Sequence, residues 1–355
     1  MHTISATNYS VYFDLKGYET LAEMLNPSLY SKIFILVDEN TSLYCLPHLL
    51  NHLATEMEIE IIELEVGEIH KNIATCTEVW GALSELGADR KSIMINLGGG
   101  VISDLGGFVA CTFKRGIDFI NIPTTLLSMV DASIGGKNGV DLGNLKNQIG
   151  IIREPKAVLV DTQFLSTLPQ NEMRSGLAEM LKHGLIFDKK YWDKFKNLKD
   201  LYTADLNQLI HQSIQIKNTI VCEDLTENGV RKSLNFGHTL GHAIESYFLE
   251  NESKTTLLHG EAIAVGMILE SYISREKNLL TNNEYQEIKY IINDIFERIE
   301  FSQVDIDKII ELLIFDKKNE FGKVQFALLD GIGKIKINQE SDNQLIYKAF
   351  EDYSM

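Results

Sequence analysis

Three histidines and one glutamate in the second half of the sequence are residue types that bind divalent metals. His238 and His242 are four residues apart, and His259 and Glu179 lie in two other glycine-flanked apolar segments. Neutral imidazoles and a carboxylate are the usual protein ligands of a catalytic zinc ion. Helical spacing places His238 and His242 on one face, so spacing alone predicts that both are ligands. A lone histidine is usually a packed or surface residue, but three of nine in such segments favour a metal site.

A glycine-rich stretch, Gly98-Gly-Gly-Val, follows a predicted strand ending at Asn96 and leads into a helical segment. Glycines allow a ligand close to the backbone, and the amides at a helix N-terminus attract a pyrophosphate. The spacing is not the usual dinucleotide fingerprint, so a turn without a ligand is the alternative. Asp104 is expected near the start of the helix, where it could equally be an N-cap. Asp38 and Asn40 follow another predicted strand, where they could bind a ribose or form a turn.

A third group of polar residues lies in residues 123–140 and 145–148. These segments combine hydroxyls, Lys137 and Lys146 on a backbone interrupted by glycines, and Arg115 precedes them. Such side chains are suited to binding a polyol and its anionic groups. Solvated surface loops contain the same residue types, but their density here favours a binding site.

Composition narrows the class of protein. The 355-residue chain has a formal net charge of −17, which argues against nucleic acid or an anionic membrane as a partner. Its four cysteines include no CxxC pair, so neither a disulfide framework nor a cysteine zinc site is expected. The N-terminus has no signal-peptide pattern, and no apolar run approaches the roughly 18 residues of a membrane span. We therefore expect a cytoplasmic protein.

Hydrophobic patterning divides the chain near Pro169. Before it, short β-rich runs alternate with helical patterns such as residues 73–86, which predicts a doubly wound parallel α/β domain. After it, most of the chain is amphipathic helix, although two short apolar runs at 324–329 and 335–337 suggest a hairpin. The predicted strands are 33–37, 59–66, 92–96, 119–122 and 158–160.

Along nearly its whole length the sequence resembles the 3-dehydroquinate synthase family. The resemblance includes Gly98-Gly-Gly-Val-Ile-Ser-Asp, Val130-Asp-Ala-Ser-Ile-Gly-Gly-Lys and Asn235-Phe-Gly-His-Thr-Leu-Gly-His. The other matching segments are 105–109, 114–116, 123–127, 145–147, 176–182, 224–231, 258–261 and 316–318. It implies an α/β Rossmann-like N-terminal domain over residues 1–168, followed by an all-α C-terminal domain over 169–355. The first would bind NAD, the second metal and substrate, and the chain would form a homodimer.

The resemblance also assigns residues. The metal, zinc or cobalt, would be held by Glu179, His238 and His259, which makes His242 a substrate and proton-transfer residue instead of a ligand. The NAD-binding residues would be Asp38, Asn40, Glu68, Lys71, Gly98, Gly99, Gly100, Val101, Asp104, Thr124, Thr125, Leu127, Asp131, Lys137, Lys146, Asn147, Phe164, Thr167 and Leu168. The substrate would meet Arg115, Lys146, Asn147, Lys182, Lys217, Arg231, Asn235, His242 and one of Lys317 and Lys318. The residues nearest the chemistry would be His242, Lys137, Arg231, Asn235, Lys217 and Asp131.

The implied reaction converts 3-deoxy-D-arabino-heptulosonate 7-phosphate, a sugar-acid phosphate of the shikimate pathway, to 3-dehydroquinate and phosphate. It passes through transient oxidation by NAD, phosphate elimination, re-reduction, ring opening and aldol closure. Ser103 and His183 depart from the family's usual glycine and tyrosine. A polyol dehydrogenase is the main alternative, related sugar-phosphate cyclases come next, and a catalytically silent NAD-binding protein ranks last.

Overall fold

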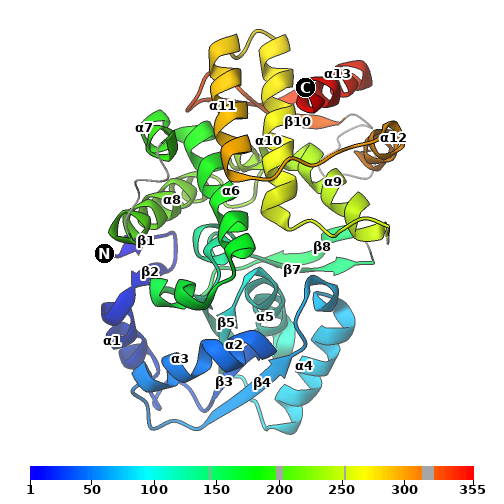
Figure 1. The fold of residues 1–355 in the computed structure, drawn as a ribbon. Coiled ribbons are helices and arrows are strands. Elements are labelled where there is room, and N and C mark those ends of the chain that lie inside the picture. The colour runs from blue at the N-terminus through cyan, green and yellow to red at the C-terminus, as the bar shows by residue number, and fades with distance from the viewer. Residues whose placement is uncertain (144, 197–202, 252, 314–323) are drawn as a thin grey trace. The chain divides into compact units, whose positions relative to one another are not determined.

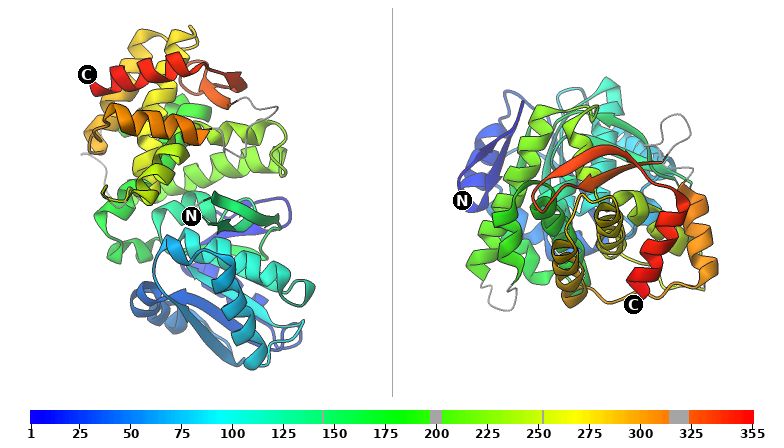
Figure 2. Two further views of the ribbon diagram at one scale, coloured as in Figure 1. Left: turned by 90° about the vertical axis from the view of Figure 1, so that its right-hand side faces the viewer. Right: turned by 90° about the horizontal axis from the view of Figure 1, so that it is seen from above.

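The computed structural model describes residues 1–143, 145–196, 203–251, 253–313 and 324–355 (Figures 1 and 2). The chain forms two compact units, Met1–Pro169 and Gln170–Met355. The predicted domain boundary, between residues 168 and 169, differs from the boundary of these units by one residue. The residues assigned to the metal all lie in the second unit. Among the described residues, no helix combines the length and apolar character needed to cross a membrane.

A seven-stranded sheet forms the centre of the first unit. Its strand order is β1-β2-β9-β6-β5-β3-β4, and every neighbouring pair except β1 and β2 is parallel. The bounds are β1 Ile4–Ser5, β2 Ser10–Phe13, β3 Ile33–Asp38, β4 Ile59–Leu64, β5 Ile93–Gly98, β6 Asp118–Pro123 and β9 Ala157–Val160. All five predicted strands are confirmed. Central strands such as β3 and β5 are buried on both faces, which explains their continuous apolar runs.

Helices connect the strands and cover the sheet. They are α1 Asp14–Met24, α2 Glu39–Tyr44, α3 Leu46–His52, α4 Ile73–Glu85 and α5 Gly100–Thr112. Short 3₁₀ turns lie at η1 Glu68–His70, η2 Phe113–Arg115 and η4 Thr162–Thr167. In the sheet, β3 and β5 are neighbours. The strand that follows β3 in the chain, β4, lies on the outer side of β3, and the strand that follows β5, β6, lies on the opposite side, next to β5. The topological switch point, where doubly wound sheets bind ligands, therefore lies between the carboxyl ends of β3 and β5.

The sequence patterns missed part of the first unit. Residues 123–148 were expected to be glycine-broken loops, but they include a π-helical turn, η3 Ser128–Ala132, and an antiparallel hairpin. The hairpin strands are β7 Lys137–Leu142 and β8 Leu145–Ile152. Polar residues and glycine are mixed with apolar ones in both strands, so the sequence has no clear two-residue alternation. Several of the apolar side chains, including Leu142, Leu145 and Ile152, are exposed.

The second unit is built mainly from helices around α10 (Figure 1). They are α6 Gln170–Phe187, α7 Lys189–Asp193, α8 Thr203–Glu223, η6 Val230–Asn235, α9 His238–Glu250, α10 His259–Glu276, α11 Asn282–Ile295, α12 Gln303–Leu312 and α13 Asn343–Ser354. Helix α10 is buried on nearly every side and packs against α6, α9, α11 and α13. The all-α expectation is wrong in one respect. Strands β10 Gln325–Leu329 and β11 Ile335–Glu340 form an antiparallel pair, which confirms the hairpin predicted from the two apolar runs.

Candidate active site

Three helices of the second unit bring the predicted metal ligands together. His238 and His242 lie in the first two turns of α9, His259 begins α10, and Glu179 lies in the middle of α6. One ring nitrogen from each of the three histidines lies within 4.8 Å of the others. The Oε1 atom of Glu179 is 3.4 Å from His238 Nε2 and 3.8 Å from His259 Nε2. Residues from three separate segments thus converge on one point.

The surroundings of the rings direct Nε2 of two histidines toward Glu179. His238 Nδ1 lies 3.0 Å from the carbonyl oxygen of Phe236, and His259 Nδ1 lies 3.3 Å from Glu245 Oε2. An imidazole that donates through Nδ1 keeps a lone pair on Nε2 for a metal. Burial by itself lowers the pKa of His259, but the carboxylates of Glu245 and Glu179 raise it to about 9. This set of donors, with Glu179 fully buried, fits a divalent cation.

The position of His242 is compatible with both roles considered for it. Its ring centroid is 5.1 Å from that of His238 and 5.7 Å from that of His259. The four-residue spacing on α9 explains why the His242 ring lies close to that of His238. At this distance from the other two rings, His242 can either ligate a metal or contact a substrate bound beside the metal. The exclusion of His242 from the ligand set therefore stays a prediction.

The basic residues assigned to the substrate in this unit come from elements that pack together. Lys182 lies on α6, Lys217 on α8, and Arg231 and Asn235 in η6, and these three elements contact one another. Lys182, Lys217 and Arg231 are all buried, and Lys182 forms an ion pair with Glu179. Burial of several cations in a chain of net charge −17 indicates a local site for anionic groups. Lys317 and Lys318 lie outside the described residues.

Sequence reasoning missed two carboxylates in this region. Asn235 Nδ2 donates to Glu227 Oε1 at 2.7 Å, so Glu227 lies beside an assigned substrate residue. Glu245 contacts His259 as described above, and it is 5% exposed. A signal existed for Glu245, because it follows His242 by three residues and shares its face of α9. The Asp224 carboxylate shapes the turn around Glu227 by accepting hydrogen bonds from backbone amides at 228, 229 and 231.

In the first unit, Lys71 links three of the segments assigned to NAD. Its Nζ donates to Asp104 Oδ2 and to Asn147 Oδ1, each at 2.7 Å. Lys146 Nζ lies 3.3 Å from Glu68 Oε1 in the same region. Burial opposes charge on Lys71, but Asp104 and the neighbouring acidic groups raise its pKa, so the ammonium persists. Five predicted cofactor residues that are distant in sequence are therefore neighbours.

The glycine turn has the form expected of a site for close backbone approach. Gly99 is the N-cap of α5 and provides no side-chain cap for the first amides of the helix. A Cβ on Gly99 would lie 3.0 Å from Thr125 Cγ2, and Thr124 donates its backbone amide to Gly98 O. Asp104 is the fifth residue of α5, so the alternative that it caps this helix is wrong.

The other assigned residues of the first unit lie on several different elements. Asp38 is the N-cap of α2 and accepts the Thr41 amide at 2.8 Å, so it begins a helix instead of forming the isolated turn given as the alternative; its ribose contact stays a prediction. Asn40 lies exposed on α2, and Val101 lies in the first turn of α5. Leu127 is the N-cap of η3, Asp131 lies within η3, Arg115 ends η2, and Lys137 begins β7. Phe164 and Thr167 lie in η4, and Leu168 is its C-cap.

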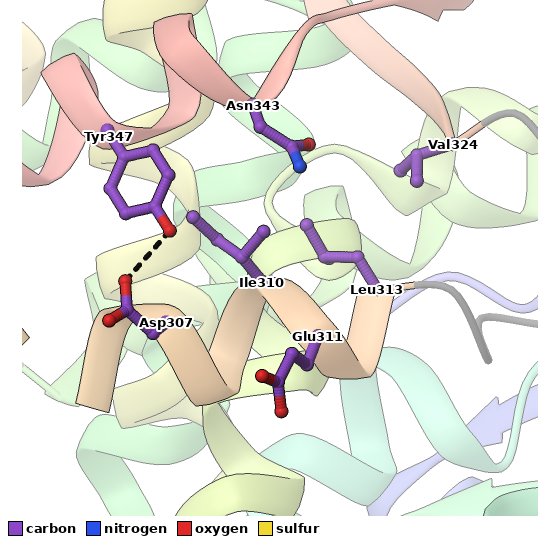
Figure 3. A pocket seen from close by; sticks show the side chains of 7 residues that line it. All are labelled: Asp307, Ile310, Glu311, Leu313, Val324, Asn343 and Tyr347. Atoms are coloured by element: carbon purple, nitrogen blue, oxygen red, sulfur yellow. Dashed lines mark hydrogen bonds between the residues drawn. The ribbon is translucent and has the colours of Figure 1, made fainter. Parts of the chain in front are cut away.

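A cavity of about 440 Å³ in the second unit is lined by residues other than the histidines and Glu179 (Figure 3). The described lining residues belong to α12 and α13, together with Leu313 and Val324. Within the cavity, Asp307 accepts a hydrogen bond from Tyr347. Within the described part of the chain, its lining includes Asp307 and Glu311 but no histidine, lysine or arginine. None of these described side chains offers a positive charge to a phosphate.

Comparison with protein families decides the relationship of the chain. A family model described as 3-dehydroquinate synthase N-terminal matches residues 61–175, and one described as 3-dehydroquinate synthase C-terminal matches residues 176–319. The chain belongs to the 3-dehydroquinate synthase family. A 3-dehydroquinate synthase of Parabacteroides distasonis is 40% identical over 343 residues, which cover 96% of each chain.

Solved structures related to the family share the whole architecture. The structure of 2-deoxy-scyllo-inosose synthase with carbaglucose-6-phosphate, NAD+ and Co2+ has a TM-score of 0.85 and 26% identity, covering 99% of both chains. The 2-epi-5-epi-valiolone synthase ValA of Streptomyces hygroscopicus, with NAD+ and Zn2+, has the same TM-score and identity over 100% of this chain and 99% of its own.

The two departures from the usual 3-dehydroquinate synthase pattern have local explanations. The hydroxyls of Ser103 and Ser128 are 3.0 Å apart, and His183 Nδ1 lies 2.7 Å from Ser213 Oγ. All four side chains are buried. Both departures thus make hydrogen bonds inside their own unit.

Proposed function

We propose that this chain is a 3-dehydroquinate synthase, a carbon–oxygen lyase acting on 3-deoxy-D-arabino-heptulosonate 7-phosphate. The observation that carries the proposal is the convergence of Glu179 with three imidazoles beside a group of buried cations. A polyol dehydrogenase needs a similar metal site but not the cations. Membership of the 3-dehydroquinate synthase family and 40% identity to a relative of that name support the same substrate.

Two cofactors belong to the proposal. Glu179, His238 and His259 would hold Zn2+ or Co2+, and the residues around the β3 and β5 carboxyl ends would hold NAD+. Related cyclases have been solved with NAD+ and with Co2+ or Zn2+. When bound, NAD+ supplies reversible hydride transfer, and the metal lowers the pKa of a coordinated alcohol.

The side chains of the second unit would orient the substrate and control its protons. Lys182, Lys217 and Arg231 would bind the carboxylate and phosphate, because charge-assisted hydrogen bonds are strong where water is excluded. Asn235, fixed by Glu227, would contact a hydroxyl. The imidazole of His242 would hold or transfer a proton, because its ordinary pKa is near neutrality.

Residues of the first unit would complete substrate and cofactor binding. Lys71 would fix Asp104 and Asn147 at the NAD+ site through its two hydrogen bonds. Arg115, Lys137 and Lys146 would bind anionic groups, and Asp131 would lie near the reacting atoms. One of Lys317 and Lys318 would contribute a further cation.

The test is a complete turnover assay. Purified protein is incubated with NAD+, Zn2+ and the heptulosonate phosphate, while phosphate release, NADH absorbance and product NMR are recorded with and without a chelator. We expect equal amounts of phosphate and 3-dehydroquinate, no accumulation of NADH and loss of turnover on chelation. Accumulating NADH with a polyol would indicate a dehydrogenase, and turnover of another sugar phosphate alone would indicate a different cyclase.

We also propose that the chain acts as a homodimer in the cytoplasm, without nucleic-acid or membrane partners. The resemblance to the family supports the dimer, and four cysteines that form no disulfide fit a reducing compartment. Light scattering on the eluting protein measures its mass, and a monomer at micromolar concentration would contradict the dimer.

A further inference from the structure

A buried carboxylate that the proposed chemistry does not use lies at the start of α9. Glu270 is on α10 and is 0% exposed. Its Oε2 accepts the backbone amide of Gly237 at 2.7 Å, and its Oε1 accepts that of Leu240 at 3.1 Å. Gly237, the N-cap of α9, provides no side-chain cap. A residue of a neighbouring helix therefore satisfies the amides that a local cap would normally bond.

The location of Glu270 connects the helices that carry the histidines. It follows His259 by eleven residues, which is three helical turns, so both side chains lie on nearly the same face of α10. The amides that it binds flank His238 in the first turn of α9. One carboxylate thus joins the turn carrying His238 to the helix carrying His259.

Close backbone packing and a second carboxylate define the rest of this contact. A Cβ on Gly266 of α10 would lie 2.0 Å from Gly237 O, and one on Gly241 of α9 would lie 2.7 Å from Ile263 Cδ1. Farther along α9, Glu245 contacts His259 Nδ1. A carboxylate of α10, Glu270, therefore binds the start of α9, and a carboxylate of α9, Glu245, contacts the start of α10. Glycines lie at the close contact between these two links.

We propose that Glu270 is a positioning residue that sets the placement of His238 relative to His259 and Glu179. A carboxylate buried without its hydrogen bonds is costly, so shifts of α9 along α10 that break them are disfavoured. Metal sites need ligand distances within about 0.2 Å, so a small shift of α9 would weaken binding. The inference rests on the metal site of the proposed function, but it assigns a role to a residue outside that site.

The test compares Glu270→Gln with a matched control, Glu284→Gln. Gln keeps the size of the side chain, but its NH2 group opposes one of the two amides. Glu284 also accepts two backbone amides, from Thr281 at 3.0 Å and Ile332 at 3.3 Å, but it lies on α11 and touches no assigned ligand. Zn2+ affinity is measured by competition with a chromophoric chelator, and ligand geometry by the visible absorption of bound Co2+.

We expect E270Q to bind Zn2+ about tenfold more weakly and to change the Co2+ spectrum, an effect of the size seen for outer residues of metal sites. E284Q should retain both properties even where its melting temperature falls. Unchanged affinity and spectrum in folded E270Q would overturn the inference, as would equal losses in both variants. If E270Q does not fold, Glu270→Asp, which retains the charge but shortens the reach, is judged by the same criteria. Failure of the unmodified protein to bind metal would instead reject the proposed function.

Discussion

Replacing Gly266 with alanine should separate α9 from α10 and weaken the metal site. The added Cβ would lie 2.0 Å from Gly237 O and 2.8 Å from Gly241 N, whereas real Cβ contacts under 3.0 Å are essentially never seen. Both atoms belong to backbone, so no side chain can turn away. The helices must therefore part locally by about 1 Å, several times the distance tolerance of about 0.2 Å for metal ligands.

The stability cost of this substitution lies at the upper end of the range for overpacked cores, roughly 3 kcal/mol. In a unit of this size, that corresponds to a Tm lower by roughly 6–12 °C. Zn2+ affinity should fall at least about tenfold, by comparison with the losses caused by outer-shell changes. Scanning calorimetry measures the first effect, and chelator competition well below Tm measures the second.

Gly81→Ala provides the matched control. Gly81 lies inside α4, and nothing lies within 4 Å of the position that its Cβ would occupy. The same substitution should therefore raise stability by roughly 1 kcal/mol through helix propensity and leave metal affinity unchanged. A G266A protein with unchanged Tm and Zn2+ affinity would refute the idea that close α9–α10 packing sets the ligand geometry.

Three further predictions concern other parts of the molecule. His238→Ala or Glu179→Ala should lose bound metal and turnover, whereas His242→Ala should keep metal and lose turnover. Elemental analysis measures the metal content, and a full metal content in His238→Ala would contradict the ligand assignment. Lys71→Met should weaken NAD+ binding by roughly 2 kcal/mol, about thirtyfold, because the Asp104 carboxylate loses its ammonium partner, and calorimetric titration measures it. Burial opposes ionisation of Asp305, but hydrogen bonds from Lys254 and Tyr247 hold its pKa well below the usual value. The ionised Asp305 carboxylate therefore stabilises the fold above its unfolded-state pKa of about 4, and this stabilisation is lost as pH falls through the lower folded-state pKa. Asp305→Asn should lower the free energy of unfolding by roughly 2 kcal/mol at pH 7, measured by urea unfolding. At low pH the variant and the unmodified protein should differ less.

Local sequence patterns were enough to predict the strands that are buried on both faces and the kinds of residue at the site. Strands such as β3 and β5 need apolar side chains on both sides, so their runs are continuous and local. Glycines after β5 and the four-residue spacing of His238 and His242 are likewise local features. The β7–β8 hairpin was missed because its polar, apolar and glycine residues follow no two-residue alternation, and only the pairing of the two strands defines it.

Which distant residues meet depends on how the helices and strands pack in the folded chain. Glu179 and His259 are eighty residues apart, and only the packing of α6 against α10 brings the carboxylate to 3.8 Å from the ring. Lys71 likewise reaches Asn147 only through the fold. Glu270 has the sequence pattern of an ordinary helical glutamate, and the position of Glu245 on the face of His242 does not show that His259 is its partner. Their roles depend on partners in another helix, and such contacts come from the packing of the whole unit.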